Sequence, residues 1–218
     1  MHIQSSFRAK PADDAKLNEP GSVSALLTAM QPAAVTLYAA DTSIYNQGDA
    51  AGPLYLVEFG TVRVCRLTAD GRRQITAFHS DGDVFGFEAG TEHDSYAESV
   101  DGAGIRVLRS ATGNEPTGSI LMLALKSLAR TQNHLMVLGR RTANEKMASL
   151  LVDLAERQGD DRQVHLSMQR NDIADYLGIT FETVSRILRT FKDQGIIRLK
   201  SISEIEILDQ TALEDMCD

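Results

Sequence analysis

The sequence predicts an α+β protein that has an N-terminal β-roll similar to a jelly roll, a long helix, and a C-terminal winged helix-turn-helix. Glycines separate short alternating apolar runs from about residue 36 to 110, which is typical of strand–turn–strand folding. A heptad-spaced apolar seam follows, and two amphipathic patterns then flank Gly178. The expected segments are a flexible arm (1–24), a β-roll sensor domain (25–115), a dimerisation helix (116–142) and the winged helix-turn-helix (143–218).

The composition of the 218 residues is that of a globular protein, with 43% hydrophobic residues. No apolar run approaches the ~20 residues of a membrane span. The first residues lack the apolar core of a signal peptide, so we expect a cytoplasmic protein that does not enter the membrane. Cys65 and Cys217 match no disulfide or metal-ligand spacing.

The formal net charge of −8 is unevenly distributed along the chain. Residues 140–200 hold 11 Lys or Arg and 9 Asp or Glu, whereas the remainder holds 11 basic and 21 acidic residues. A slightly basic segment in an acidic chain favours a local DNA-binding domain. It also predicts weak binding to non-specific DNA, because phosphate neutralisation drives that interaction.

The first 110 residues predict a polar arm, one short helix and a series of strands. The short helix is expected within 21–35, around Leu26, Leu27 and Met30. Strands are expected at 54–57, 61–67 and 74–79, and Asp70-Gly71 is a strong hairpin signal between the last two. An eight-stranded roll fits this spacing. Cys65 is expected on a strand face as a small apolar side chain, with a redox role as the weaker alternative. His79 and His93 are expected on the surface or on strands rather than as metal ligands.

The seam of the long helix has alternating spacings of four and three residues, and it consists of Leu121, Leu125, Leu128, Gln132, Leu135, Gly139 and Thr142. A helix over 118–141 would be about 36 Å long. Its length favours pairing with the same helix of a second copy, with Gln132 fixing the register. The alternative is a helix whose apolar face packs on its own roll.

The region after this helix predicts the remaining parts of a winged helix-turn-helix. Met147, Leu150, Leu151 and Leu154 form an amphipathic helix that ends near Gln158-Gly159. A short strand is expected at 164–167. After the two central helices, Gly195 is the expected stop, and strands at 196–199 and 204–208 form the hairpin.

The segment from Arg170 to Arg189 predicts the helix-turn-helix itself. Its inward positions are apolar or small: Ile173, Ala174, Leu177, Ile179, Val184, Ile187 and Leu188. Gly178 can leave the first helix with positive φ, and the Thr180 hydroxyl can cap the second. The complete set of inward positions favours this motif over two unrelated core helices.

The outward side chains of the second helix have the chemistry required to read base edges. Glu182 can accept a hydrogen bond from cytosine N4, and Arg186 can bind guanine O6 and N7 in a bidentate way. Ser185 is short enough to contact a base edge closely. Thr183 and Arg189 are expected phosphate contacts, and Thr180 and Arg170 complete the candidate DNA-binding set. The alternative for Glu182 and Arg186, which are four residues apart, is a solvated ion pair.

The run Glu182-Thr-Val-Ser-Arg186 resembles the E-x-x-S-R motif of the FNR and FixK branch of the CRP/FNR transcription regulators. Members of that branch bind a two-fold site similar to TTGAT, four free bases, then ATCAA. The segments at 47–49, 54–62 and 81–86 resemble the cyclic-nucleotide-binding-like β-roll of the same family. The resemblance implies a homodimeric activator of microaerobic or nitrogen-oxide metabolism that binds double-stranded DNA. It also implies contact with RNA polymerase through exposed loops, for example around Arg72-Arg73.

Two departures from family patterns bear on cofactors. The arm has no cysteine cluster, so no iron–sulfur cluster is expected. Cyclic-AMP-binding relatives hold the cyclic phosphate with an Arg-Ser pair, and Ser95 and Tyr96 occupy those positions here. Ser95 lacks the bidentate guanidinium, so we expect DNA binding without a cyclic nucleotide, other cofactor or metal. The alternative is a ligand-gated regulator whose roll binds haem or another small effector. We expect no enzyme activity, because no nucleophile–base set, metal cluster or phosphate loop occurs.

Overall fold

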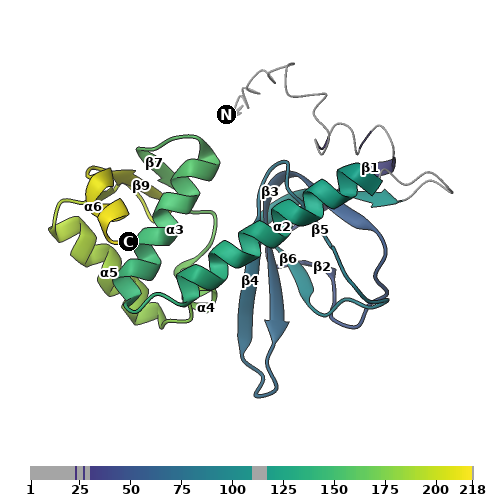
Figure 1. Ribbon diagram of the computed structural model, residues 1–218, viewed down its shortest axis with the longest axis horizontal. Helices are drawn as coiled ribbons and strands as arrows, with labels where there is room; N and C mark the ends of the chain where they lie inside the picture. The colour runs from purple at the N-terminus through teal and green to yellow at the C-terminus, as the bar shows by residue number, and fades with distance from the viewer. Residues whose placement is uncertain (1–22, 24–26, 28–29, 110–116, 218) are drawn as a thin grey trace, which may run out of the picture.

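The computed structural model describes residues 23, 27, 30–109 and 117–217 (Figure 1). An antiparallel sheet forms the N-terminal roll. Its strands are β1 (Gln31–Tyr38), β2 (Ser43–Tyr45), β3 (Leu54–Leu67), β4 (Arg73–His79), β5 (Val84–Phe85) and β6 (Tyr96–Arg109). The C-terminal elements are α3 (Ala143–Gln158), β7 (Gln163–His165), α4 (Arg170–Leu177), α5 (Phe181–Asp193), β8 (Ile197–Leu199), β9 (Glu204–Ile207) and α6 (Gln210–Asp215). The long helix α2 (Thr117–Leu138) runs from the roll to this C-terminal part (Figure 1).

The roll is organised around β3 and β6, its two longest strands. Its strand order is β1-β6-β3-β4, with β2 paired to β6 and β5 paired to β3. The described residues thus form six strands where the sequence predicts eight. One reason is that 54–57 and 61–67 belong to a single bent strand. Gly60 has φ +86° at the bend, and a Cβ there would lie 2.1 Å from the carbonyl oxygen of Gly102. Only glycine allows the backbones of β3 and β6 to approach this closely.

Aromatic side chains fill the interior of the roll. Tyr45 stacks on His93 at a centroid distance of 3.8 Å, and Tyr55 stacks on Phe85 at 5.3 Å. All four residues are buried. His93, expected on the surface or on a strand, is buried because this stack and Glu88, 3.1 Å from its Nδ1, surround it. His79 lies on β4 and is also buried.

The prediction of a helix at 21–35 is wrong for the last five of these residues. Residues 31–35 belong to β1, which pairs with β6 from Gln31 opposite Arg109. Pairing with a long neighbouring strand thus overrides the local pattern around Leu26, Leu27 and Met30. Most of residues 21–29 and the arm lie outside the described residues.

Helix α2 ends at Leu138, so Gly139 and Thr142 are not part of its apolar seam as predicted. Thr142 instead caps α3, where its side chain accepts a hydrogen bond from the Glu145 backbone N–H. The Glu145 side chain accepts in return from the Thr142 backbone N–H, which completes a capping box. The local capping signal therefore ends the heptad pattern about one turn early.

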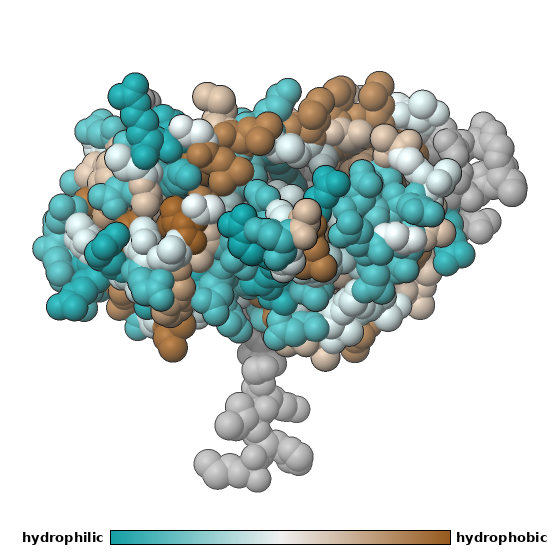
Figure 2. Space-filling model, turned by 90° about the horizontal axis from the view of Figure 1, so that it is seen from below, coloured by the Kyte–Doolittle hydropathy of each residue, from teal (hydrophilic) through white to brown (hydrophobic). Residues whose placement is uncertain are grey.

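The two faces of α2 differ in exposure. Leu123 packs in a buried cluster with Leu54, Leu56 and Leu108 of the roll. The seam leucines, in contrast, are about half exposed or more: Leu121 56%, Leu125 48%, Leu128 52% and Leu135 60%. Helix α2 therefore packs on its own roll through Leu123, as the alternative predicts, whereas the seam leucines are exposed. Figure 2 shows apolar side chains reaching the surface along one edge of the molecule.

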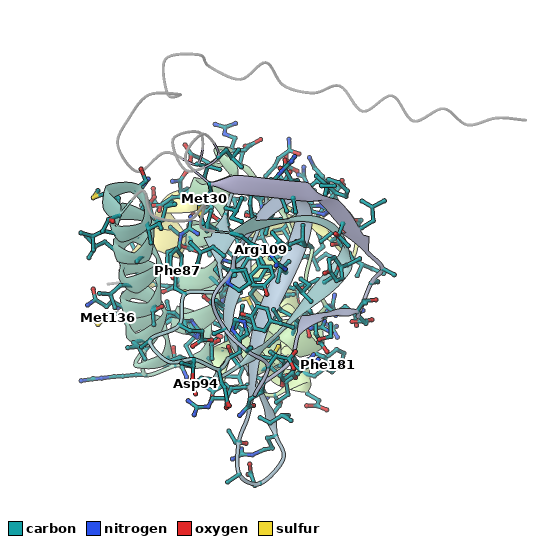
Figure 3. All side chains as sticks on the ribbon, turned by 90° about the vertical axis from the view of Figure 1, so that its right-hand side faces the viewer. Met30, Phe87, Asp94, Arg109, Met136 and Phe181 are labelled. Carbon is teal, nitrogen blue, oxygen red and sulfur yellow. The ribbon has the colours of Figure 1, made fainter. Side chains whose placement is uncertain are left out.

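Met122 and Met136, which the seam prediction omits, are also exposed and widen this apolar face beside Leu121 and Leu135. Figure 3 shows Met136 on the outer side of α2 and Phe87 on the side toward the roll. We call the exposed side chains Leu121, Met122, Leu125, Leu128, Leu135 and Met136 the α2 face. Gln132 is also exposed on this helix.

Buried ion pairs join the roll to α4. Asp172, 2% exposed, accepts from Arg63 of β3 at 3.0 Å and from Arg73 of β4 at 2.6 Å. Arg73 also donates to Asp175 at 2.7 Å, and Arg63 donates to Asp41 at 2.7 Å. We call Arg63, Arg73, Asp172 and Asp175 the interdomain ion cluster. Because Arg73 is committed to α4, only Arg72 of the predicted Arg72-Arg73 loop is fully exposed.

The two cysteines lie in different environments. Cys65 is fully buried on β3, and burial raises the pKa of its thiol to about 11. Its expected place on a strand face is confirmed. Cys217 is half-buried, with Sγ 3.2 Å from the Leu213 carbonyl oxygen. In the described part of the chain, no group of three His, Cys, Asp or Glu side chains could hold a metal ion, and no helix is long and apolar enough to cross a membrane.

Candidate nucleic-acid interface

Helices α4 and α5 cross closely because small and apolar residues line their contact. Ala174 and Leu177 of α4 and Val184 and Leu188 of α5 are all buried in one cluster. Gly178 ends α4 with φ 62° and ψ 41°, and its N–H donates to the Ala174 carbonyl. This left-handed residue turns the chain sharply toward α5. The predicted inward positions, the turn and both helices are confirmed.

Thr180 begins the recognition helix. Its side chain accepts from the Thr183 N–H at 3.3 Å, and the two threonine hydroxyl oxygens are 3.1 Å apart. The Thr180 hydroxyl thus serves the helix as its N-cap, as predicted. The cap uses the hydroxyl oxygen as an acceptor, so it does not exclude the predicted contact with DNA, in which this hydroxyl would donate its proton.

The charged side chains of α5 are directed to solvent, and those of Glu182 and Arg186 form no ion pair in the described structure. Hydrogen bonds from the backbone N–H of Glu182 and from Thr180 lower the pKa of the Glu182 carboxyl. This side chain therefore remains an ionised acceptor at neutral pH. Arg189 contacts only Asp193, at 3.7 Å, on a surface where such pairs contribute little.

Arg170, from the start of α4, contacts the recognition helix directly. Its Nη1 donates to Ser185 Oγ at 3.3 Å. The Ser185 hydroxyl keeps its own proton for another acceptor, because the guanidinium is always the donor in this contact. Arg170 therefore orients a predicted base-reading residue, and this role supplements its predicted contact with DNA.

Two features of this surface are absent from the sequence prediction. Phe181, the first residue of α5, is 44% exposed next to Glu182, and a phenyl ring can contact a thymine methyl. Ile202 is 86% exposed between β8 and β9. Both residues are apolar and lie outside the inward-facing pattern of the sequence, and this combination could have identified them.

The hairpin of the wing is confirmed, and it belongs to a sheet of order β7-β9-β8. Arg198 of β8 donates to Glu206 of β9 at 2.8 Å. Helix α6 follows and was not predicted. It buries Leu213 against α3, and it has only six residues, too few for a clear helical period.

The arrangement presents a capped helix that carries an ionised carboxylate, a hydroxyl and a free guanidinium beside a β-hairpin. These groups suit hydrogen bonding to base edges in a major groove. The described residues place Glu182, Ser185 and Arg186 together on α5, whereas the predicted seam residues lie apart from them on α2. The structure thus contains two separate surfaces, one polar and one apolar.

Family comparisons agree with this division of the chain. Residues 35–101 match the pattern of the cyclic nucleotide-binding domain, and residues 145–216 match the Crp-like helix-turn-helix domain. The nitrogen fixation regulation protein FixK of Rhizobium meliloti is 44% identical over 186 residues, which cover 85% of this chain and 88% of that protein. FixK of Azorhizobium caulinodans is 41% identical over 189 residues, covering 81% and 76%.

A solved structure, that of FixK2 from Bradyrhizobium japonicum, superposes with a TM-score of 0.78. It is 34% identical and covers 87% of this chain and 98% of that one. The similarity includes the roll, α2 and the C-terminal helices rather than the helix-turn-helix alone.

Proposed function

The chain belongs to the FixK-like branch of the CRP/FNR family of DNA-binding transcription regulators, and we propose that it acts as a dimer on a TTGAT-N4-ATCAA-like palindrome. The observation that carries this proposal is the set formed on α5 by the exposed Glu182 and Arg186 and by Ser185, whose hydroxyl is oriented by Arg170. Arg186 reads the guanine and Glu182 the facing base pair of each half-site, while Thr183 and Arg189 bind phosphates. Thr180 and Arg170 contribute from the ends of the adjoining helices.

The α2 face supports a homodimer. Its apolar side chains repeat at heptad spacing over a 22-residue helix, and they are exposed in the single chain. A continuous exposed apolar face of this kind marks a protein contact. A two-fold DNA site also requires two copies of the reading helix. Leu121, Leu125, Leu128, Gln132 and Leu135 pair across this interface.

The interior of the roll supports DNA binding without a cyclic nucleotide. Glu88 is held by His93, and a hydrogen bond joins the Tyr45 and Ser95 side chains. These contacts and the stacked rings occupy the region where a nucleotide phosphate would need a guanidinium, and Ser95 supplies none. A haem or another effector in the roll is the alternative.

Membership of the family supports a role as an activator of genes for microaerobic or nitrogen-oxide metabolism. In this role the protein also contacts RNA polymerase. Arg72 is the proposed polymerase contact, because it is 82% exposed and only Asp70 pairs with it. The functional division is an arm (1–24), the β-roll (25–115), the dimerisation helix (116–142) and the winged helix-turn-helix (143–218).

The test is a titration of a labelled TTGAT palindrome with freshly purified full-length protein, in parallel with a scrambled duplex. We expect preference for the palindrome, equal with and without saturating cyclic AMP or cyclic GMP. Tenfold tightening by either nucleotide, about 1.4 kcal/mol of coupling, would overturn the ligand-free proposal. Equal affinity for the two duplexes would show that the protein does not recognise the TTGAT palindrome.

A further inference from the structure

A cleft of about 310 Å³ lies where the roll, α2, α3 and α4 meet. β4 supplies Phe78 and His79, α2 supplies His134, and α4 supplies Tyr176. Figure 1 shows α2 passing between the roll and the C-terminal helices at this junction. The cleft adjoins the aromatic interior of the roll, because His79 stacks on Phe85 at a centroid distance of 5.2 Å, and its lining includes no residue of α5.

The two histidines of the cleft have buried nitrogens that no protein group satisfies. His134 and His79 are each 7% exposed. Within the described residues, both ring nitrogens of His134 and Nδ1 of His79 lack a hydrogen-bond partner. A buried polar atom without a partner costs about 1–3 kcal/mol, so a molecule that supplies the missing hydrogen bonds would bind favourably here.

The ring of His134 is held in place despite its missing hydrogen bonds. It stacks on Tyr176 at a centroid distance of 3.8 Å and an interplanar angle of 16°. Tyr176 in turn contacts the edge of Phe78 at 5.1 Å. Burial lowers the pKa of both His134 and His79 to about 4. Each ring is therefore neutral at pH 7 and offers one donor or acceptor per nitrogen.

The charges around the cleft compensate one another. Arg130 and Arg157 both bind Asp83, at 2.6 and 3.1 Å. Arg157 also pairs with Asp153 at 3.7 Å, and Arg140 and Glu156 add one charge of each sign to the lining. These six charges sum to zero, so the cleft favours neither sign of ligand charge, and an uncharged molecule loses less hydration on entering it than a charged one. Aromatic walls and neutral imidazoles instead suit a flat polar molecule.

We propose that this cleft is an effector site for a small, uncharged, planar molecule that carries both a hydrogen-bond donor and an acceptor, such as an aromatic amide or a nucleobase. The molecule hydrogen-bonds to His134 and His79 between aromatic walls. Because it contacts β4, α2 and α4 together, it changes the position of the reading helices and hence the affinity for the operator. This last step rests on the proposed DNA-binding function.

His134→Phe tests the site, because it keeps a flat ring beside Tyr176 and removes both nitrogens. His165→Phe, at an exposed position on β7, is the matched control. The His134 variant should melt no lower than the wild type, since it deletes two unsatisfied buried atoms. A clear drop in Tm would mean that the protein or bound water already satisfies this ring, and would overturn the site.

Binding is measured on the full-length protein without DNA, with benzamide, nicotinamide and adenine as uncharged probes and benzoate and toluene as comparisons. The probes should raise Tm and shift the His79 ring signals in NMR spectra of the wild type and of His165→Phe. Affinity for His134→Phe should be about tenfold weaker. Equal binding to His134→Phe, equal binding of benzoate, or no binding by any uncharged probe contradicts the proposal.

The regulatory step is measured separately, by operator titration with and without a probe that binds. We expect at least about a threefold change in affinity, within the range of allosteric coupling. An unchanged operator affinity overturns the effector role. Absence of operator binding under every condition would instead count against the proposed DNA-binding function, since the binding assay contains no DNA.

Discussion

Helices α4 and α5 form one helix-turn-helix, yet their charged residues have opposite environments. Asp172 and Asp175 of α4 are engaged by Arg63 and Arg73 of the roll, up to 109 residues away in the sequence. On α5, Glu182 and Arg186 are exposed and have no ion-pair partner in the described structure. The charges of α4 are thus paired within the protein, whereas the charges of α5 that we propose to read DNA remain available.

The apolar residues of α2 differ in the same way, since some are covered by the roll and others are exposed. Leu123 of α2 is buried against the roll, while Leu128, on the α2 face, is 52% exposed. The covered residue holds the helix in its own subunit, and the uncovered residue is available to a second subunit. Substitutions at covered positions should therefore change stability, and those at uncovered positions should change association.

The largest expected effect is on assembly. Leu128→Glu places a carboxylate from each subunit in the proposed apolar interface, which should weaken the dimer by several kcal/mol and reduce operator binding with it. Light scattering at low concentration measures the change. Lys126→Glu, an exposed position of α2 outside the α2 face, should leave the dimer intact. A dimeric Leu128 variant would disprove the proposed seam.

Asp172→Ala should reduce the free energy of unfolding by roughly 3 kcal/mol, the lower end for a broken buried ion pair. The estimate is low because Arg63 keeps Asp41 and Arg73 keeps Asp175. Urea unfolding gives the value, and Asp193→Ala on exposed α5 should change it by less than about 0.5 kcal/mol. Equal losses at the two positions would remove the distinction between α4 and α5.

Glu182→Ala should leave stability nearly unchanged and relax sequence preference by about 1–2 kcal/mol at one base pair of each half-site. Affinities for operators with every substitution in one half-site identify that pair. A variant that loses affinity equally for all operators would show that Glu182 does not specify sequence.

The smallest effect is expected at Arg189, whose only ion-pair partner in the described chain is Asp193. Arg189→Ala should weaken all DNA sequences alike and reduce the slope of log affinity against log salt by about 1. The titration is repeated at several salt concentrations on the operator and on scrambled DNA. A loss confined to one base pair would assign Arg189 to base reading instead.

The reading helix was predictable because its pattern is local. Val184, Ile187 and Leu188 repeat at helical spacing, and Gly178 and Thr180 mark its boundary. The exposed leucines of α2 follow from heptad spacing in the same way. Local rules also misled the prediction at 31–35, where pairing with β6 determines the structure.

The interdomain ion cluster and the orphan imidazoles were not predictable, because they depend on contacts between distant segments. Nothing near Asp172 in the sequence indicates that it is buried. Arg73 and its exposed neighbour Arg72 are the same residue type, so the sequence does not show which of them is paired. His134 follows no motif, and the Tyr176 ring that stacks on it comes from α4, more than 40 residues later in the sequence.

The proposed function depends above all on Arg186, which we propose reads the guanine of TTGAT in each half-site. The most direct measurement compares the wild type and Arg186→Ala on the palindrome and on a palindrome in which both of these guanines are replaced by adenine. The wild type should lose about 1–3 kcal/mol per half-site on the altered DNA, whereas Arg186→Ala should bind both duplexes almost equally. Equal losses for the two proteins on the altered palindrome would contradict the assignment of Arg186.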